Sequence, residues 1–249
     1  MKAFAVVLLC FFAAVHGRST GVQVRTAAAL GENPWVVHIR TAVSTSGLLN
    51  SCTGTLIDSS WVLTSANCLR DARFVWIRYG AIDVTRPELV TESGAGPITF
   101  HPEFNPETGA NDIAVINTNR FVQPTDNVSP VVLAGADDEV PSAGQFCGFG
   151  AGDDSSVPGE TLNCYEVTVE ESDGSLVASS DEGAATQFDI GAALVSDGVQ
   201  YGVLVGYPGD DDTTAASFLS LSAYKEWIAS VTGIGAADAG FGSDVMVVN

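Results

Sequence analysis

Short apolar runs separated by turn residues recur along most of this chain. Clear examples occupy residues 35–39, 74–79, 112–116 and 199–205. Several short runs at this spacing are typical of an antiparallel sandwich or barrel. The pair Asp197-Gly198 separates two such runs, and Gly tolerates the positive φ of a two-residue hairpin turn. The pattern therefore predicts an all-β domain with a hairpin at this pair.

One segment near the end of the chain has helical periodicity. Its apolar residues fall on one face of a helix, and they are Leu221, Tyr224, Trp227, Ile228 and Val231. We expect Ser222 to cap the start of this helix and Gly233 to end it. Residues 234–249 are rich in Gly, Ala and Asp and are expected to form a mobile tail. Residues 121–133, with two Pro, are predicted to connect two halves of the domain.

The first seventeen residues have the pattern of a secretory signal peptide. Lys2 supplies the positive start, an apolar run of about thirteen residues follows, and residues 15–17 form a small-residue cleavage site. The apolar run is too short to span a bilayer, and no other stretch is both long and apolar enough. The sequence thus predicts an exported, extracellular protein that begins at residue 18.

The charge of the chain limits its partners. Without Lys2 the mature part keeps 30 acidic residues against 9 basic ones, a net charge of about −21. Phosphate backbones and anionic lipids repel such a chain, which argues against nucleic-acid and membrane partners. The acidic runs at 137–139, 153–154 and 210–212 lack the spaced ligands of a calcium loop. We therefore expect no metal and no cofactor.

Several motifs occur in an order that characterises one family. They are Pro34-Trp35-Val36-Val37, Cys52-Thr53-Gly54-Thr55-Leu56-Ile57, Trp61-Val62-Leu63-Thr64, Asn111-Asp112-Ile113-Ala114, Gly148-Phe149-Gly150 and Tyr224-Lys225-Glu226-Trp227-Ile228. Together they resemble the trypsin/chymotrypsin-like serine proteases, above all secreted insect ones, from about residue 22 to residue 233. The resemblance implies two six-stranded antiparallel β-barrels, at about 22–125 and 131–233, with a cleft between them and the C-terminal helix outside.

The same resemblance locates a catalytic triad in which two side chains are replaced. Residues 64–68 read Thr-Ser-Ala-Asn-Cys where the family has Thr-Ala-Ala-His-Cys, which puts Asn67 at the position of the general base. Residues 188–194 read Phe-Asp-Ile-Gly-Ala-Ala-Leu where the family has Gly-Asp-Ser-Gly-Gly-Pro-Leu, which puts Ile190 at the position of the nucleophile. An amide cannot take a proton near neutral pH, and Ile has no nucleophilic atom. Asp112 matches the third triad position and, without a His to orient, is interpreted as a carboxylate that caps a strand end.

Other parts of the family's site are also altered. Phe188 replaces a Gly of the oxyanion hole, which it would share with Ile190, and should shift a donating N–H. The pocket positions align with Ala184 at the floor and Tyr207 at the rim, where Tyr207 is expected to fill or cover the pocket. Asp189 persists, although residues 21–25 lack the Ile-Val-Gly-Gly start that would supply its ammonium partner. It is either a relic of that switch or a solvated or locally hydrogen-bonded loop residue.

Four cysteines remain after the signal peptide takes Cys10 away, and they predict two disulfides in an oxidising compartment. Four cysteines allow three pairings. The family's spacing implies the pair Cys52–Cys68. The second pair, Cys147–Cys164, departs from the family's usual pairings and is predicted because the two should face each other across a hairpin. Neither His38 nor His101 matches a catalytic position, so no relocated base is expected.

These replacements predict a secreted, catalytically inactive serine protease homologue. Its function would be to bind a secreted protein, namely a substrate, an inhibitor or an active protease, without cleaving it. An abundant structural or storage component of an extracellular fluid or coat is a second reading, and a residual serine endopeptidase is a third. The oligomeric state is left open.

Overall fold

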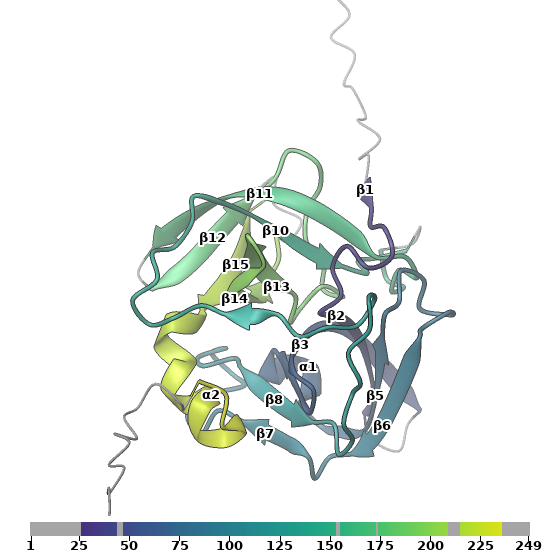
Figure 1. Ribbon diagram of the computed structural model, residues 1–249. Coiled ribbons are helices and arrows are strands. Elements are labelled where there is room, and N and C mark those ends of the chain that lie inside the picture. Colours follow the sequence, from purple (N-terminus) through teal and green to yellow (C-terminus); the bar gives the residue numbers. More distant parts are fainter. Residues whose placement is uncertain (1–25, 44–46, 153–154, 173, 209–214, 236–249) are drawn as a thin grey trace, which may run out of the picture.

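The computed structural model describes residues 26–43, 47–152, 155–172, 174–208 and 215–235. Two β-sheets lie one above the other in this part of the chain, and a short helix near its end packs beside them (Figure 1). The predicted all-β class with a C-terminal helix is thereby confirmed. The predicted signal peptide, the segment 21–25 and the tail beyond residue 235 lie outside the described residues.

The first sheet is built from residues 36–117. Its strands are β2 (Val36–Val43), β3 (Leu48–Asp58), β4 (Trp61–Thr64), β5 (Ala72–Tyr79), β6 (Leu89–Gly94), β7 (Ile98–Phe100) and β8 (Ala114–Asn117), in the order β6-β5-β2-β3-β4-β8-β7. The two end strands follow each other in sequence, separated by a turn in which the Ile98 N–H donates to the Ala95 carbonyl at 3.1 Å. Because β6 pairs with β5 and β7 with β8, this bent segment connects both ends of the sheet. Counted as one bent strand, it gives the expected six strands.

The second sheet contains a closed ring of six strands. Its elements are β9 (Val132–Leu133), β10 (Ala143–Gly148), β11 (Asn163–Ser172), β12 (Ser175–Ser179), β13 (Ala193–Ser196), β14 (Val199–Gly206) and β15 (Ala216–Ser220). The ring runs β10-β11-β12-β15-β14-β13, and β9 adds to β14 in parallel. The strand β1 (Thr26–Ala27) pairs with β11. The predicted N-terminal barrel, at about 22–125, includes these two residues. In the structure they pair instead with a strand of the C-terminal barrel.

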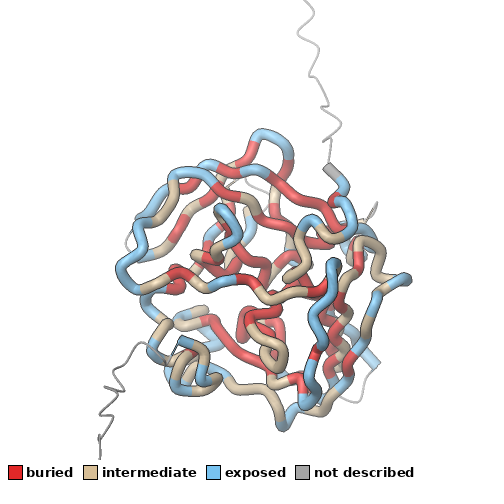
Figure 2. Tube along the Cα trace, in the orientation of Figure 1, coloured by how far each residue is buried: buried red, intermediate tan, exposed pale blue. Residues whose placement is uncertain are grey.

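Four apolar cores hold the described part of the chain together. One fills the N-terminal barrel, a second fills the C-terminal barrel, a third lies between the barrels and under the C-terminal helix, and a fourth joins residues near Val36 to the β10–β11 pair. Figure 2 shows buried positions gathered along the inner strands and exposed positions along the connecting loops. Since the third core contains residues of both barrels, the loops that meet at their boundary are held in fixed relative positions.

The helices are α1 (Ala66–Leu69), the 3₁₀ helix η1 (Leu221–Tyr224) and α2 (Lys225–Thr232). The predicted end at Gly233 is confirmed, since this residue has φ 77° and its N–H donates to the Ala229 carbonyl at 2.8 Å. The predicted cap was wrong. Ser222 lies inside η1 and Tyr224 precedes α2, because the segment begins with a tighter 3₁₀ turn. The short α1 has no periodic signal in the sequence and was not predicted.

The predicted turn and both predicted disulfides are present. Asp197 and Gly198 have φ of 49° and 77° and connect β13 to β14, as a two-residue hairpin with positive φ requires. Cys52 bonds to Cys68, with their Cα atoms 6.0 Å apart. The other two cysteines, 147 and 164, face each other in the β10–β11 pair and are also bonded, with a Cα–Cα distance of 4.1 Å.

Candidate functional site

The residues that the family resemblance assigned to catalysis come together at the boundary between the barrels. Asn67 lies on α1, Asp112 lies just before β8, and Phe188 and Ile190 lie on the loop before β13. A pocket of about 260 Å³ opens among them. It is lined by Leu49, Asn50, Ser51, Cys52, Asn67, Cys68, Gln187, Phe188 and Ile190. This pocket therefore joins strand β3 and helix α1 of the N-terminal barrel to one loop of the C-terminal barrel.

The Asp112 carboxylate is buried and holds the start of α1. One of its oxygens accepts hydrogen bonds from the Ser65 hydroxyl and the Asn67 backbone N–H, both at 2.7 Å. The other oxygen accepts the Asn67 side-chain amide at 2.9 Å. The carboxylate thus caps a helix rather than a strand end, and it fixes the Asn67 side chain at the pocket wall. An amide in this place can position a ligand but cannot accept a proton near neutral pH.

The C-terminal barrel lines the pocket with Gln187, Phe188 and Ile190. Ile190 is partly buried and packs against the core of the C-terminal barrel, while its carbonyl accepts the Thr53 N–H of β3 at 3.0 Å. The next residue, Gly191, has φ 90°, and a Cβ there would collide with the Thr64 hydroxyl and the Thr53 carbonyl. Only glycine fits this crossing, so the loop of one barrel is locked onto strands of the other. Ile190 is held at the pocket and offers it no reactive atom.

The backbone donor predicted to be displaced at Phe188 has a partner within its own loop. The Phe188 N–H donates to the Thr186 hydroxyl oxygen at 3.3 Å. An oxyanion hole needs donors that are aimed at the position where negative charge develops. A donor engaged by a neighbouring hydroxyl does not meet this requirement without a change of partner.

Asp189, between these two residues, is 1% exposed and accepts several local hydrogen bonds. The Gly150 N–H reaches one oxygen at 2.7 Å, and the Thr186 N–H and hydroxyl reach the other at 2.8 and 2.9 Å. Of the two interpretations left open by the sequence, the locally hydrogen-bonded residue describes these contacts. The carboxylate is buried rather than solvated, and it ties the loop to the residues after β10.

The two predicted pocket positions do not line this pocket. Ala184 is partly buried on the loop after β12. Tyr207 follows β14 directly and its side chain is 45% exposed. That Tyr207 fills or covers a pocket stays a prediction, because residues 209–214 beside it lie outside the described part of the chain.

A buried histidine contacts a serine of the pocket, which the sequence did not indicate. His38 Nε2 lies 2.8 Å from the Ser51 hydroxyl, and Arg78 Nη1 lies 3.2 Å from His38 Nδ1. Arginine only donates hydrogen bonds, so Nδ1 accepts and the proton of the neutral ring is on Nε2. Burial and the charges of Arg78 and Arg40 lower the pKa of His38 to about 3. Nε2 therefore donates to Ser51 and cannot activate it as a base.

The other histidine, His101, contacts the C-terminal helices and does not line the pocket. His101 packs edge-on against Tyr224 and Trp227 of the C-terminal helices, with ring centroids 5.3 and 5.2 Å away. Its Nδ1 accepts the Glu103 N–H at 3.2 Å. These contacts indicate that His101 helps to pack the C-terminal helices against the N-terminal barrel.

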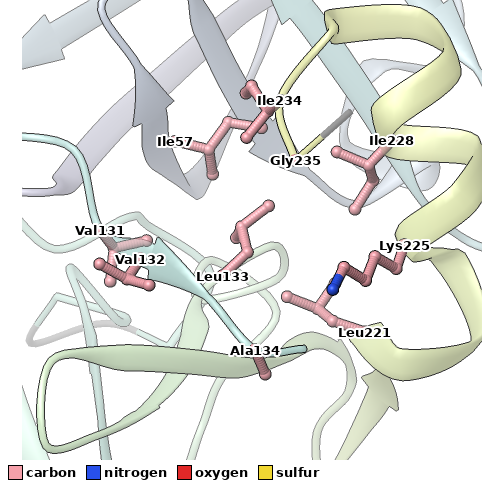
Figure 3. Close-up of a pocket in the computed structure, with 10 residues that line it drawn as sticks. All are labelled: Ile57, Val131, Val132, Leu133, Ala134, Leu221, Lys225, Ile228, Ile234 and Gly235. Atoms are coloured by element: carbon pink, nitrogen blue, oxygen red, sulfur yellow. The ribbon is translucent and has the colours of Figure 1, made fainter. Parts of the chain in front are cut away.

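A second pocket, of about 280 Å³, lies between the connector strand β9 and the C-terminal helix (Figure 3). Its lining is apolar except for one ammonium group and consists of Ile57, Val131, Val132, Leu133, Ala134, Leu221, Lys225, Ile228, Ile234 and Gly235. It shares no residue with the pocket at Asn67 and Ile190. Within the described ranges, no group of three or more potential metal ligands occurs, and no helix has the length and apolar character to cross a membrane.

Comparison with known proteins identifies the family. The chain matches the trypsin family over residues 22–228. Mast cell protease 3 of Ovis aries is 29% identical over 204 residues, which cover 74% of this chain and 78% of that protein. Collagenase of Hypoderma lineatum is 40% identical over 82 residues, which cover 33% of this chain and 30% of that protein.

Solved structures agree with this assignment. The HL collagenase structure superposes with a TM-score of 0.75 at 24% identity, covering 86% of this chain and 99% of that one. The scabies mite inactivated protease paralogue S-D1 gives a TM-score of 0.70 at 21% identity, covering 84% and 96%. At these identities the likeness concerns the fold, and it confirms the chymotrypsin-like arrangement of two barrels. With a family match that spans most of its length, this chain belongs to the trypsin family.

Proposed function

We propose that this protein is a secreted, non-catalytic member of the trypsin family that binds a polypeptide at the pocket between its barrels. One observation carries the proposal. The pocket is lined by Asn67, which Asp112 fixes, and by Ile190, and neither of these side chains can act as a base or a nucleophile. The likeness to a structure described as an inactivated protease paralogue is compatible with this function.

Several missing or altered catalytic groups together oppose hydrolysis. Loss of the nucleophile or its base lowers turnover about 10⁶-fold in a serine protease, and loss of one oxyanion donor costs roughly a further 10²- to 10³-fold. His38 does not replace the base, because its Nε2 donates to Ser51. Turnover from such a site would not exceed the background.

The pocket keeps features that suit binding. Leu49 and Phe188 give it apolar surface, while the Asn67 amide and Asn50 offer hydrogen bonds at its edge. Its volume of about 260 Å³ suits one side chain of a partner rather than a whole small molecule. Since the pocket is open, the neighbouring loops can contact the rest of that partner. The strongly acidic composition and the two disulfides agree with an extracellular protein partner rather than nucleic acid or a membrane.

Site-directed photocrosslinking tests this proposal. Benzoylphenylalanine replaces Gln187, which is exposed and lines the pocket, and in a control it replaces Asp197 on the exposed β13–β14 turn. In the extracellular fluid of the source organism, we expect the protein labelled at 187 to form one discrete crosslinked product that the protein labelled at 197 does not form. Excess unlabelled wild-type protein should suppress the product, and excess Ile190→Arg variant should not.

A storage or structural role predicts the opposite outcome. The protein would then dominate its fluid and form no product specific to position 187. Residual peptidase activity is tested separately with a fluorophosphonate probe, which should not label the purified protein. Labelling in repeated preparations would falsify the non-catalytic assignment, and its loss in a Ser51→Ala variant would identify Ser51 as the reactive group.

A further inference from the structure

The outer side of the N-terminal barrel carries two arginines beside exposed apolar side chains. Directly opposed residues of an antiparallel sheet point to the same side. One row of β3, β2 and β5 contains Leu49, Ala42 and Phe74, and the next contains Ser51, Arg40 and Trp76. The third row places Arg78 opposite His38. Arg40, Leu49, Phe74, Trp76 and Arg78 together form what we call the Arg40–Phe74 face.

The apolar part of this face is open to solvent. Leu49 is 47% exposed and Phe74 is 58% exposed, and the Phe74 ring stacks on Trp76 with centroids 6.3 Å apart. The Trp76 indole N–H donates to Glu92 at 3.1 Å, which fixes the ring. Aromatic side chains fixed in this way lose little entropy on binding and are frequent anchors of interfaces.

The arginines of the face lack carboxylate partners. Among the described residues, neither Arg40 nor Arg78 has a carboxylate within ion-pair distance, although the chain has three times as many acidic as basic residues. The Arg78 guanidinium donates instead to His38. Burial and the charge of Arg40 both lower the pKa of Arg78. Two neighbouring cations without an anion are costly, and a negative group placed between them would remove this cost.

The geometry points to the Arg40–Phe74 face as a docking surface for an acidic polypeptide segment with an apolar anchor. The anchor side chain packs on Phe74, Trp76 and Leu49, and the carboxylates pair with Arg40 and Arg78. Two row spacings along β5 separate Phe74 from Arg78, roughly 13 Å, which corresponds to about four residues of an extended segment. Leu49 and Ser51 also line the pocket at Asn67 and Ile190, so the face continues from that pocket. The inference rests on the proposed function and names the chemistry of the partner.

A peptide selection tests the inference. A phage library of random twelve-residue peptides is selected on the whole purified protein, and the enriched peptides are synthesised with fluorescein. We expect enrichment of peptides that combine Asp or Glu with Phe, Trp or Leu. Fluorescence anisotropy should show affinity at least about tenfold weaker for the Arg40→Gln/Arg78→Gln variant, because charge-assisted hydrogen bonds are lost. Phe74→Ser should weaken binding as well, and added salt should weaken it progressively.

Arg120→Gln is the matched control, since Arg120 is an exposed arginine of the same barrel outside the face. It should leave affinity unchanged, and thermal unfolding should show that all variants are folded. Peptides without acidic enrichment, no enrichment at all, or unchanged affinity in the double variant would overturn the inference. The outcome is separable from that of the crosslinking experiment. Crosslinking at 187 with no effect of the arginine variants would reject the Arg40–Phe74 face as a docking surface and would still support the proposed function. Peptide binding that depends on the arginines, without crosslinking at 187, would support the docking surface and reject the proposed function at the pocket.

Discussion

The two barrels contribute different kinds of change to the same pocket. On the N-terminal side, a buried carboxylate, Asp112, still hydrogen-bonds the side chain at position 67, and only the chemistry of that side chain differs from a base. On the C-terminal side, the Asp189 carboxylate and the Phe188 N–H are both engaged within one loop by Thr186. One half is therefore changed by a single side chain, whereas the other is a network of mutually dependent contacts. Reversal by substitution should be easy in the first and difficult in the second.

The barrels also differ in charge. Residues 26–125 contain 6 basic and 9 acidic residues, whereas residues 126–249 contain 1 basic and 21 acidic ones. The acidic partner proposed above would therefore be repelled more strongly by the C-terminal half than by the N-terminal half, and this difference would favour its approach to the Arg40–Phe74 face.

Removal of each of the two buried carboxylates should have the largest effect on the free energy of unfolding. The two losses should differ, which distinguishes the two sides of the pocket. Asp189→Ala leaves the buried Gly150 N–H and two Thr186 donors without an acceptor, and we expect a loss of about 4 kcal/mol in unfolding free energy. Asp112→Ala should cost less, about 2 kcal/mol, because the partly exposed Asn67 amide can turn to water. Urea unfolding measures both. Equal losses would show that the two sides of the pocket are built alike.

Burial of His38 beside Arg78 and Arg40 should make stability depend on pH. Its ring also packs edge-on against Phe149 of the C-terminal barrel, with ring centroids 4.9 Å apart. The pKa of His38 is about 3 in the folded protein and about 6.5 when unfolded, so the unfolded chain binds more protons between these values. Stability contributed by the neutral ring is complete above pH 6.5 and is lost as the pH falls toward 3. The loss should reach roughly 2 to 3 kcal/mol at pH 4.5.

The His38→Gln variant isolates this effect from the many carboxylates. Gln can still donate to Ser51 and accept from Arg78, and it does not titrate. Subtracting its pH profile from that of the wild type should leave a curve that falls with decreasing pH through this window. A flat difference would mean that protonation of His38 is tolerated beside Arg40, Arg78 and the Phe149 ring.

A smaller change at the pocket tests the role of Asn67. Asn67→Ala removes one amide–carboxylate hydrogen bond and leaves the backbone capping of α1 by Asp112 in place. We expect about 1 kcal/mol of destabilisation in urea. Asn67→Ser is the matched control with a shorter polar side chain. A loss as large as that of Asp112→Ala would show that the amide, not the backbone cap, holds this side of the pocket.

The smallest effect is expected from a rebuilt triad. Asn67→His with Ile190→Ser restores the base and the nucleophile near Asp112, but the Phe188 N–H still donates to Thr186 and Asp189 stays in its local network. Catalytic groups must be held within about 0.5 Å of their working positions. We therefore expect no peptide-ester hydrolysis above background. Activity within about a hundredfold of an active relative would show that the contacts of Phe188 and Asp189 do not prevent catalysis. The two sides of the pocket would then not differ in how easily substitution reverses them.

The features that sequence reasoning predicted are those set by local pattern or by motif order. The Asp197-Gly198 turn, the helix end at Gly233 and the two disulfides each depend on a few neighbouring residues or on fixed spacing. The Asp189–Gly150 contact and the His38–Ser51–Arg78 group join residues that are far apart in sequence and have no shared motif.

The small β1–β11 pair has a consequence for how this chain is made. Thr26 pairs with Cys164, so the β1–β11 pair can form only after roughly 140 further residues have been synthesised, which takes on the order of ten seconds on a ribosome. Closing so long a loop also costs more entropy than any hairpin within either barrel. The first strand in the sequence is therefore expected to be among the last to form its hydrogen bonds during folding. A nascent chain halted before residue 160 would keep residues 26–27 accessible to protease even when the N-terminal barrel has formed.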